Sequence, residues 1–112
     1  MLIFLSVLAL INLIIFVTRL QAAAAGRPYG MSEFLYRLGT CETGLNFRWD
    51  SGSYEGFVGW YWGTWLADRY PGMPSRAYLA TPRQQIRVAY RSIARGRYFG
   101  CAVNSAWVRA AR

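Results

Sequence analysis

Apolar residues recur at spacings of three and four over residues 31–44, and this period predicts a helix with one buried face. Ser32 can cap the start of this helix, and Glu33 carries a negative charge that suits its first turn. A shorter helix is predicted over residues 63–70, where Pro71 ends it and opens a loop.

The clearest helical pattern covers residues 81–96. Thr81 and Gln84 have the spacing of a capping box, Pro82 fits the first turn, and Gly96 is a suitable end. The predicted inner face carries Ile86, Ala89, Tyr90 and Ile93. The predicted outer face carries Arg83, Arg87, Arg91 and Arg95. Such a stripe is more often a solvated face than a binding site.

Residues 44–60 change character, because aromatic and β-branched types replace the helical pattern. These types are Phe47, Trp49, Tyr54, Phe57, Val58 and Trp60. Residues 50–53 (DSGS) interrupt them with turn-forming types, which predicts two short strands around that turn. Helices around a short β-hairpin predict a small α+β domain.

The first 25 residues differ from the rest because they are almost entirely apolar up to Val17. Small residues follow, and an apolar run that ends in this way is typical of a secretory signal, here cleaved after Ala24 or Ala25. The run is long for a signal and no basic residue precedes it, so an uncleaved membrane anchor is the alternative. Both interpretations predict export of one domain, residues 26–112.

The exported part is short for a self-sufficient core, so a covalent staple is expected. Cys41 and Cys101 are the only two cysteines. In an exported protein they most simply pair with each other, with two free buried thiols as the alternative.

The formal net charge is +8, and all thirteen basic residues are arginine. This balance favours a polyanionic partner, and nucleic acid, anionic lipid and cell wall all qualify. Export argues against nucleic acid, and no nucleic-acid motif is present. Charge alone does not choose between cell wall and lipid.

The candidate chemistry is that of carboxylates. The chain has no histidine or lysine, so a Ser–His or Cys–His nucleophile has no base and a metal hydrolase lacks nitrogen ligands. The five acids are Glu33, Glu42, Asp50, Glu55 and Asp68. Glycoside cleavage is the usual chemistry of such a set.

Glu42 is the best placed of these acids. It falls at a predicted helix end, beside Cys41 and just before an aromatic segment. A carboxyl group shielded in such a place can stay protonated and donate to a glycosidic oxygen. A solvated glutamate at a helix end is the alternative.

Four segments carry a recognisable set of motifs. They are residues 41–47 (CETGLNF), 54–60 (YEGFVGW), 63–65 (GTW) and 79–89 (LATPRQQIRVA). In this order they resemble Cys-Glu-Ser-Gly-Gly-Asn-Trp, Tyr-Tyr-Gly-Gly-Leu-Gln-Phe, Gly-Thr-Trp and Leu-Ala-Thr-Arg-Glu-Gln-Gln-Ile-Ala-Val-Ala of resuscitation-promoting factors and related transglycosylase-like domains. Cys101 falls where that family has its second cysteine, and the resemblance covers residues 33–103.

The resemblance implies a small lysozyme-like α+β fold with one disulfide. It implies cleavage of peptidoglycan between N-acetylmuramic acid and N-acetylglucosamine. Glu42 matches the family's catalytic glutamate, and Thr64 matches a threonine that lines the cleft, although a helix N-cap is an equal interpretation of Thr64. A lytic transglycosylase needs Glu42 alone, whereas a hydrolase usually needs a second carboxylate, for which Asp50 and Glu55 are the candidates.

The chain departs from the family pattern at two positions. Gly59 stands where the family has a glutamine, and Leu45 stands where it has a glycine. Aromatic residues over residues 60–65 can compensate, since aromatic faces pack on sugar rings, although at least two of them are expected in the core. The predicted substrate-binding residues are Thr64, Trp60, Tyr54, Asp50 and Trp65.

Two other functions remain open: a cell-wall-binding module without activity, which the missing glutamine motivates, and a cationic membrane-active protein. The expected partner is the glycan strand of peptidoglycan, with no nucleic acid and no cofactor or metal. Membrane contact is expected only through an uncleaved N-terminal segment. The protein is expected to be a monomer that is secreted or held at the cell surface.

Overall fold

The computed structural model describes residues 6–15 and 26–112. Residues 6–15 are helical, whereas the predicted cleavage point after Ala24 or Ala25 falls outside the described residues. No helix in the described ranges is both long enough and apolar enough to cross a membrane. Residues 26–112, the predicted domain, are described without a gap.

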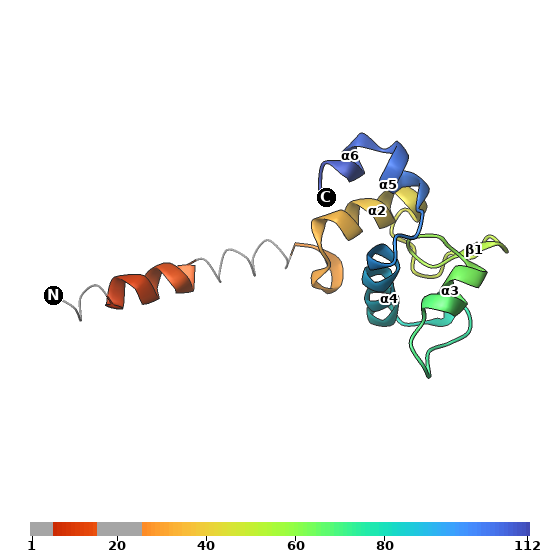
Figure 1. Ribbon diagram of the computed structural model, residues 1–112, viewed down its shortest axis with the longest axis horizontal. Helices are drawn as coiled ribbons and strands as arrows, with labels where there is room; N and C mark the ends of the chain where they lie inside the picture. Colours follow the sequence, from red (N-terminus) through yellow and green to blue (C-terminus); the bar gives the residue numbers. More distant parts are fainter. Residues whose placement is uncertain (1–5, 16–25) are drawn as a thin grey trace.

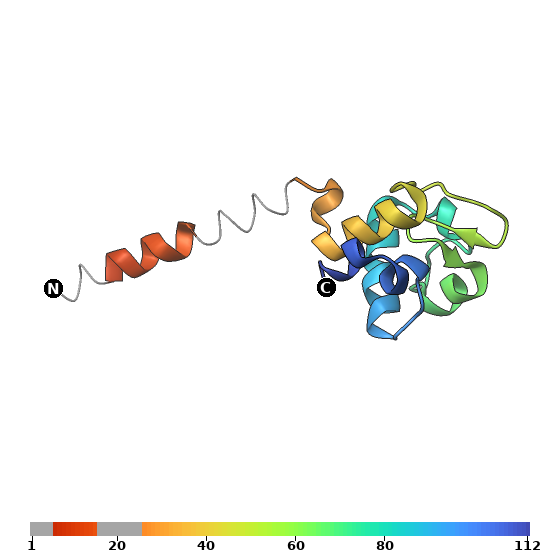
Figure 2. The same cartoon turned by 90° about the horizontal axis from the view of Figure 1, so that it is seen from above.

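The domain combines short helices with one small antiparallel sheet, which confirms the predicted α+β class (Figure 1). In chain order its elements are η1 (Pro28–Gly30), α2 (Glu33–Thr43), β1 (Tyr54–Glu55), β2 (Trp60–Tyr61), α3 (Trp62–Asp68), η2 (Ala77–Leu79), α4 (Pro82–Ala94), α5 (Gly100–Asn104) and α6 (Ala106–Arg109). Helices α5 and α6 pack against α2, whereas α3 packs against α4 and β2 (Figure 2).

The first predicted helix of the domain is α2, and both of its ends have a local cause. Ser32 caps it, because its Oγ accepts the Leu35 N–H at 3.2 Å. Gly44 ends it with a φ of 68°, a left-handed value that favours glycine. Inside the helix, a Cβ at Gly39 would lie 2.6 Å from the Phe57 ring. The absence of a side chain there lets the hairpin turn pack directly on α2.

Helix α4 has the predicted capping box, and its buried face contains the predicted Ile86 and Ala89 but not Tyr90. The Thr81 side chain accepts the Gln84 N–H at 3.2 Å, and the Gln84 side chain accepts the Thr81 N–H at 3.0 Å. Tyr90, predicted on the inner face, is 45% exposed, and its hydroxyl accepts the Ser32 N–H at 3.1 Å. Polar side chains share the inner face instead. Its buried residues are Gln85, Ile86, Val88, Ala89 and Ser92.

The hairpin lies further along the chain than predicted. The sequence pattern places strands on either side of residues 50–53, where the structure has an isolated antiparallel bridge between Asp50 and Glu55. The strands β1 and β2 both follow that segment and pair Tyr54 with Tyr61. Gly56 and Gly59 flank the connecting turn, with φ values of 76° and 70°. Glycine adopts these left-handed values at little cost, so the chain turns within a stretch of strand-forming residues. The two apolar residues between the glycines are completely buried.

One buried amide joins α4 to the segments around the hairpin. Gln85 is completely buried, and its Oε1 accepts the Phe57 N–H at 3.0 Å. Its Nε2 donates to the carbonyls of Phe47, Ala77 and Ala80 at 2.7, 2.8 and 3.1 Å. Because both polar atoms of the amide have partners, its burial leaves no unpaired group.

A buried carboxylate joins α3 to the end of α4. Asp68 is completely buried and accepts hydrogen bonds from Ser92, Arg95 and Arg97 at 2.7, 2.9 and 2.7 Å. Burial opposes ionisation of Asp68, but the hydrogen bonds from Arg97, Ser92 and Arg95 outweigh it and lower its pKa from 3.8 to about 2. Arg95, predicted on a solvated face, is therefore neutralised by an ion pair.

We expect Asp68→Asn to lower the free energy of unfolding at pH 7 by about 2 kcal/mol, because the native pKa lies below the unfolded one. The ionised carboxylate stabilises the fold above pH 4, and this contribution is lost as the pH falls from about 4 to about 2. Urea unfolding of the wild type and the variant at a series of pH values measures the difference in the free energy of unfolding. Asp50→Asn, at an exposed position, is the control and should change stability by less than about 0.5 kcal/mol. If the stability difference between Asp68→Asn and the wild type did not change with pH, this explanation would be contradicted.

Candidate active site

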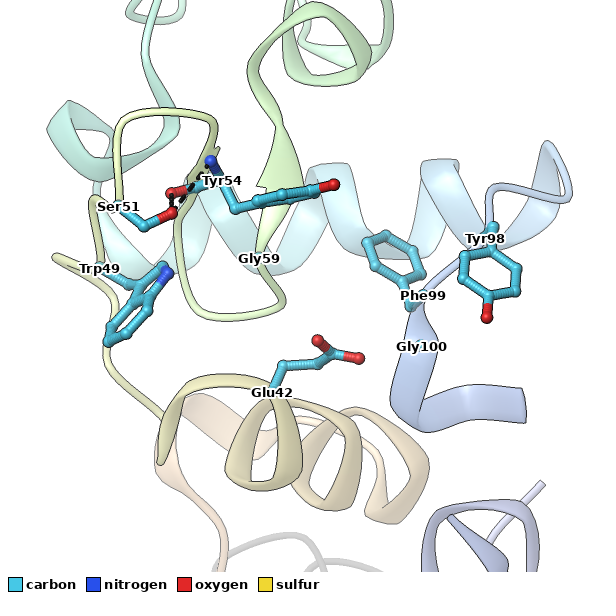
Figure 3. A pocket seen from close by; sticks show the side chains of 8 residues that line it. All are labelled: Glu42, Trp49, Ser51, Tyr54, Gly59, Tyr98, Phe99 and Gly100. Atoms are coloured by element: carbon cyan, nitrogen blue, oxygen red, sulfur yellow. Dashed lines mark hydrogen bonds between the residues drawn. The ribbon is translucent and has the colours of Figure 1, made fainter. Parts of the chain in front are cut away.

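Glu42 lies in the last turn of α2 and points into a cleft between α2, the hairpin and α5 (Figure 3). The residue is half-buried, and its Oε1 accepts the Cys101 N–H at 2.6 Å. Its Oε2 accepts no hydrogen bond from the described residues and lies toward Gly59, where a Cβ would be 3.7 Å away. One carboxyl oxygen is therefore fixed by the protein, and the other is open to the cleft.

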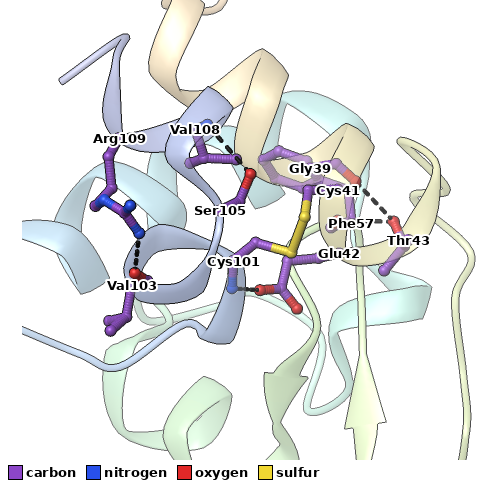
Figure 4. Close-up of a disulfide and its surroundings, with 10 residues drawn as sticks. All are labelled: Gly39, Cys41, Glu42, Thr43, Phe57, Cys101, Val103, Ser105, Val108 and Arg109. Atoms are coloured by element: carbon purple, nitrogen blue, oxygen red, sulfur yellow. Dashed lines mark hydrogen bonds between the residues drawn. A yellow bond between two sulfur atoms is a disulfide. The ribbon is translucent and has the colours of Figure 1, made fainter.

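Three consecutive residues at the end of α2 connect both sides of the cleft. The predicted disulfide is present: Cys41 bonds to Cys101 with an S–S distance of 2.07 Å and joins α2 to α5 (Figure 4). The Thr43 Oγ1 donates to the Phe57 carbonyl at 2.7 Å and joins α2 to the hairpin turn. Glu42 stands between these two attachments, so its place relative to both sides is set by covalent and hydrogen bonds.

The cleft has a volume of about 390 Å³, within the range of small-ligand sites. Three exposed aromatic rings line the cleft around Glu42: Trp49, Tyr54 and Tyr98 are 38%, 53% and 72% exposed, whereas the fourth ring, Phe99, is buried (Figure 3). The other lining residues are Ser51, Gly59, Phe99 and Gly100. The two glycines leave the carboxyl group uncovered, because a Cβ at either position would lie within 3.8 Å of one of its oxygens.

The predicted aromatic residues divide between the cleft and the core. Tyr54 lines the cleft. Trp60 and Trp65 are completely buried, so neither presents a ring face to a substrate, which corrects the prediction for these two residues. Their indole N–H groups donate to the Ser92 Oγ at 3.0 Å and to the Pro74 carbonyl at 2.9 Å. The expectation that at least two members of the cluster belong to the core is confirmed.

Thr64 and Asp50 lie outside the lining of the cleft. Helix α3 starts directly after β2, so Tyr61 is its N-cap and Thr64 is its third residue, which excludes the predicted N-cap role. Asp50 is exposed, and its Oδ1 accepts the Gly52 N–H at 3.0 Å. Asp50 therefore belongs to the turn that the sequence predicts over residues 50–53.

Glu42 is the only acid that lines the cleft, and all five acids of the chain lie in the described residues. Glu55, a candidate second carboxylate, is completely buried. Its oxygens accept hydrogen bonds from the Arg76 Nε at 2.6 Å and from the Ala77 N–H at 2.8 Å. Glu55 is therefore a structural ion-pair partner and cannot reach a substrate in the cleft.

Five residues of the cleft escape prediction from the sequence: Trp49, Ser51, Tyr98, Phe99 and Gly100. A signal exists for three of them. Residues 98–100 directly precede Cys101, so the predicted disulfide brings them beside Glu42. Trp49 has no such signal, because its surroundings resemble a strand.

No protein-family model matches the chain, and no curated protein matches it. The function is therefore inferred from the cleft itself. The cleft offers one carboxyl group with a free oxygen, among exposed aromatic rings, in a domain closed by a disulfide.

We expect the double substitution Cys41→Ala/Cys101→Ala to lower the free energy of unfolding by about 4 kcal/mol, because the bond restricts the unfolded chain. The two cysteines are 60 positions apart, and the entropy of closing a loop grows with the logarithm of its length. Urea unfolding of the oxidised protein and the variant measures the difference. A reductant should destabilise the wild type similarly and leave the variant unchanged. A difference below about 1 kcal/mol would show that the staple is not needed.

Proposed function

We propose that this protein cleaves the glycan strands of peptidoglycan between N-acetylmuramic acid and N-acetylglucosamine, as a small lysozyme-like enzyme with Glu42 as its acid/base. The observation that carries the proposal is the free Oε2 of Glu42 in a cleft surrounded by exposed aromatic rings. The resemblance of residues 41–47 to the signature of resuscitation-promoting factors supports the choice of substrate. The disulfide and the apolar N-terminal segment support action outside the cytoplasm.

The two carboxyl oxygens of Glu42 have different tasks. Oε1 accepts the Cys101 N–H, so the proton of the neutral acid is carried by Oε2, which faces the cleft. Oε2–H donates this proton to the bridging oxygen while the glycosidic bond breaks, and the released sugar keeps it as a hydroxyl. The carboxylate then accepts the proton of the muramoyl C6 hydroxyl while the C6 oxygen bonds to C1. The products are a 1,6-anhydro end and a regenerated acid.

The isolation of Glu42 favours this transglycosylase route over hydrolysis. A hydrolase with two carboxylates places them about 5–9.5 Å apart across the bond that is cut. No second acid lines the cleft, since Glu55 is buried in an ion pair and Asp50 lies outside the lining. One residue acting as acid and then as base needs no second carboxylate.

The aromatic lining suits a sugar chain. Sugar rings present flat faces of C–H groups, and large aromatic side chains contribute apolar contact area at such faces. Trp49 and Tyr98 lie in different loop segments: Trp49 precedes the hairpin and Tyr98 precedes α5. A glycan strand bound across Glu42 can therefore contact an aromatic ring on each side of the bond that is cut (Figure 3).

We expect Glu42→Gln to lower the rate of glycan cleavage about 100- to 10,000-fold, because the amide cannot donate the proton. Its side-chain oxygen can still accept the Cys101 N–H, so the cleft should keep its shape. Mass spectrometry of soluble fragments from purified peptidoglycan provides the measurement. Fragments with 1,6-anhydro ends from the wild type alone support the proposal. Only reducing ends would exclude the transglycosylase route, and equal cleavage by the variant would exclude Glu42.

We expect Trp49→Ala to weaken glycan binding about fivefold to tenfold, which corresponds to a loss of about 1 kcal/mol of ring contact. Trp107→Ala is the matched control, because Trp107 is 48% exposed on α6, away from the cleft. The KM for a soluble glycan fragment should rise for the first variant and stay within twofold for the second. Equal KM values for the Trp49→Ala and Trp107→Ala variants would show that Trp49 does not contact the glycan.

A cell-wall-binding module without activity is the second candidate, and Gly59 favours it. This position lacks the glutamine of the resembling family, and no other amide side chain lines the cleft in the described residues. Retention on insoluble peptidoglycan without soluble fragments, from a folded and oxidised protein, would favour this second candidate.

A further inference from the structure

Three arginines on α4 have no acidic partner in the part of the chain that the structure describes. Arg83, Arg87 and Arg91 follow one another at intervals of four residues and form no ion pair. The next residue in this row, Arg95, forms an ion pair with Asp68, which also binds Arg97. The row is therefore not a uniformly solvated stripe, because one end is paired with an acid and the other carries three uncompensated charges.

A single aromatic ring organises two of these charges. The Arg87 guanidinium lies 3.9 Å from the centroid of the Tyr70 ring, and that of Arg91 lies 4.5 Å from it. Two cations on one ring repel each other, and like charges four residues apart destabilise a helix. The ring attracts both cations and holds them side by side. Guanidinium groups positioned in this way lose less entropy when they bind an anion.

Arg83 and Arg87 line a groove between α4 and the turn after α3, and Arg91 shares the Tyr70 ring at its edge with Arg87. Its volume is about 410 Å³, and Arg83, Gln84 and Arg87 line it from α4, opposite residues 70–73. It shares no lining residue with the Glu42 cleft. Of its apolar lining residues, Met73 is buried and Pro71 is exposed. The groove therefore offers mainly charge and hydrogen-bond donors, which suit a polar anion better than insertion into lipid.

We propose that this groove binds a linear polyanion with repeated phosphodiester groups, of the kind attached to cell walls. Intervals of four residues place the arginines about 6 Å apart along the helix, so a linear anion can contact them in succession. Each guanidinium can donate two parallel hydrogen bonds to one phosphate. The phosphate chemistry follows from the groove, whereas the cell wall as its source rests on the proposed function.

This groove would hold the enzyme on the anionic polymer while the separate cleft acts on the glycan strand. Binding through opposite charges depends on salt, because a cation that contacts the polymer releases the polymer's counterions. Attachment would therefore weaken as ionic strength rises, and the protein could move along the polymer without losing contact.

The test measures binding of the oxidised full chain to poly(glycerol phosphate) by titration calorimetry. We expect the triple substitution Arg83→Gln/Arg87→Gln/Arg91→Gln to weaken binding on the order of tenfold or more and to reduce its salt dependence. The matched control, Arg48→Gln/Arg109→Gln/Arg112→Gln, removes the same charge from arginines that also form no side-chain ion pair in the described residues. We expect this control to weaken binding by less than about threefold. Equal losses in both triple variants would overturn the proposal in favour of a general charge effect.

Tyr70 provides a second variant that changes no charge. Tyr70→Phe keeps the ring and should bind poly(glycerol phosphate) like the wild type, whereas Tyr70→Leu removes the ring and should weaken binding about threefold to tenfold. A thermal melt identifies any variant that fails to fold, and Tyr70→Phe still tests the groove in that case. Weaker binding by Tyr70→Phe would contradict the role given to the ring.

Two further arms separate the source of the phosphate and the dependence on the proposed function. Vesicles of phosphatidylglycerol and phosphatidylcholine replace the polymer in the first arm. Loss of vesicle binding in the α4 triple variant, with polymer binding unchanged, would overturn the proposal in favour of a membrane surface. In the second arm Glu42→Gln should bind the polymer as tightly as the wild type. Polymer binding by the wild type without glycan cleavage by the wild type would support the groove while contradicting the proposed function.

Discussion

The amide of Gln85 is the interaction on which the arrangement of this domain depends. It is completely buried on α4 and reaches the backbone at Phe47, Phe57, Ala77 and Ala80. These residues belong to segments with little regular structure, so their backbone groups have few partners within a helix or sheet. One side chain supplies the missing partners and gives irregular segments a fixed position against a helix.

The geometry of the Glu42 cleft follows from that attachment. Phe57 in the hairpin turn has two partners. Its N–H donates to the Gln85 side chain, and its carbonyl accepts a hydrogen bond from the Thr43 hydroxyl. The turn is thereby fixed to α4 and to α2 at one point, and the disulfide fixes α5 to α2 on the other side of Glu42. A cleft built largely from loops thus becomes rigid without a large sheet, which suits a domain of this size.

The parts of the fold that could be predicted are those with local causes. Ser32 and Thr81 act on residues three positions away, so sequence spacing reveals both helix starts. The hairpin lies further along the chain than the sequence predicts, because Gly56 and Gly59 turn the chain within a strand-like pattern. Burial of aromatic residues depends on distant partners, such as Ser92 for Trp60, and no local spacing encodes these. Glu42 was identifiable by its place beside a cysteine and Tyr98 by its place close to the second cysteine, whereas Trp49 belongs to the cleft only through tertiary packing.

Because acids are scarce in this chain, most of them are paired with arginines, whereas many arginines have no acidic partner in the described residues. Glu33, Glu55 and Asp68 each pair with arginines and hold elements together, and Asp50 caps a turn. Glu42 is the one acid left with an unoccupied oxygen in a cleft. Thirteen arginines against five acids also leave α4 with charges that nothing in the domain neutralises. In the part of the chain that the structure describes, the same imbalance therefore leaves one carboxyl oxygen free in the Glu42 cleft and three arginines without an acidic partner beside the groove on α4. These two separate places are the basis for the proposed cleavage of one polymer and the proposed binding of another.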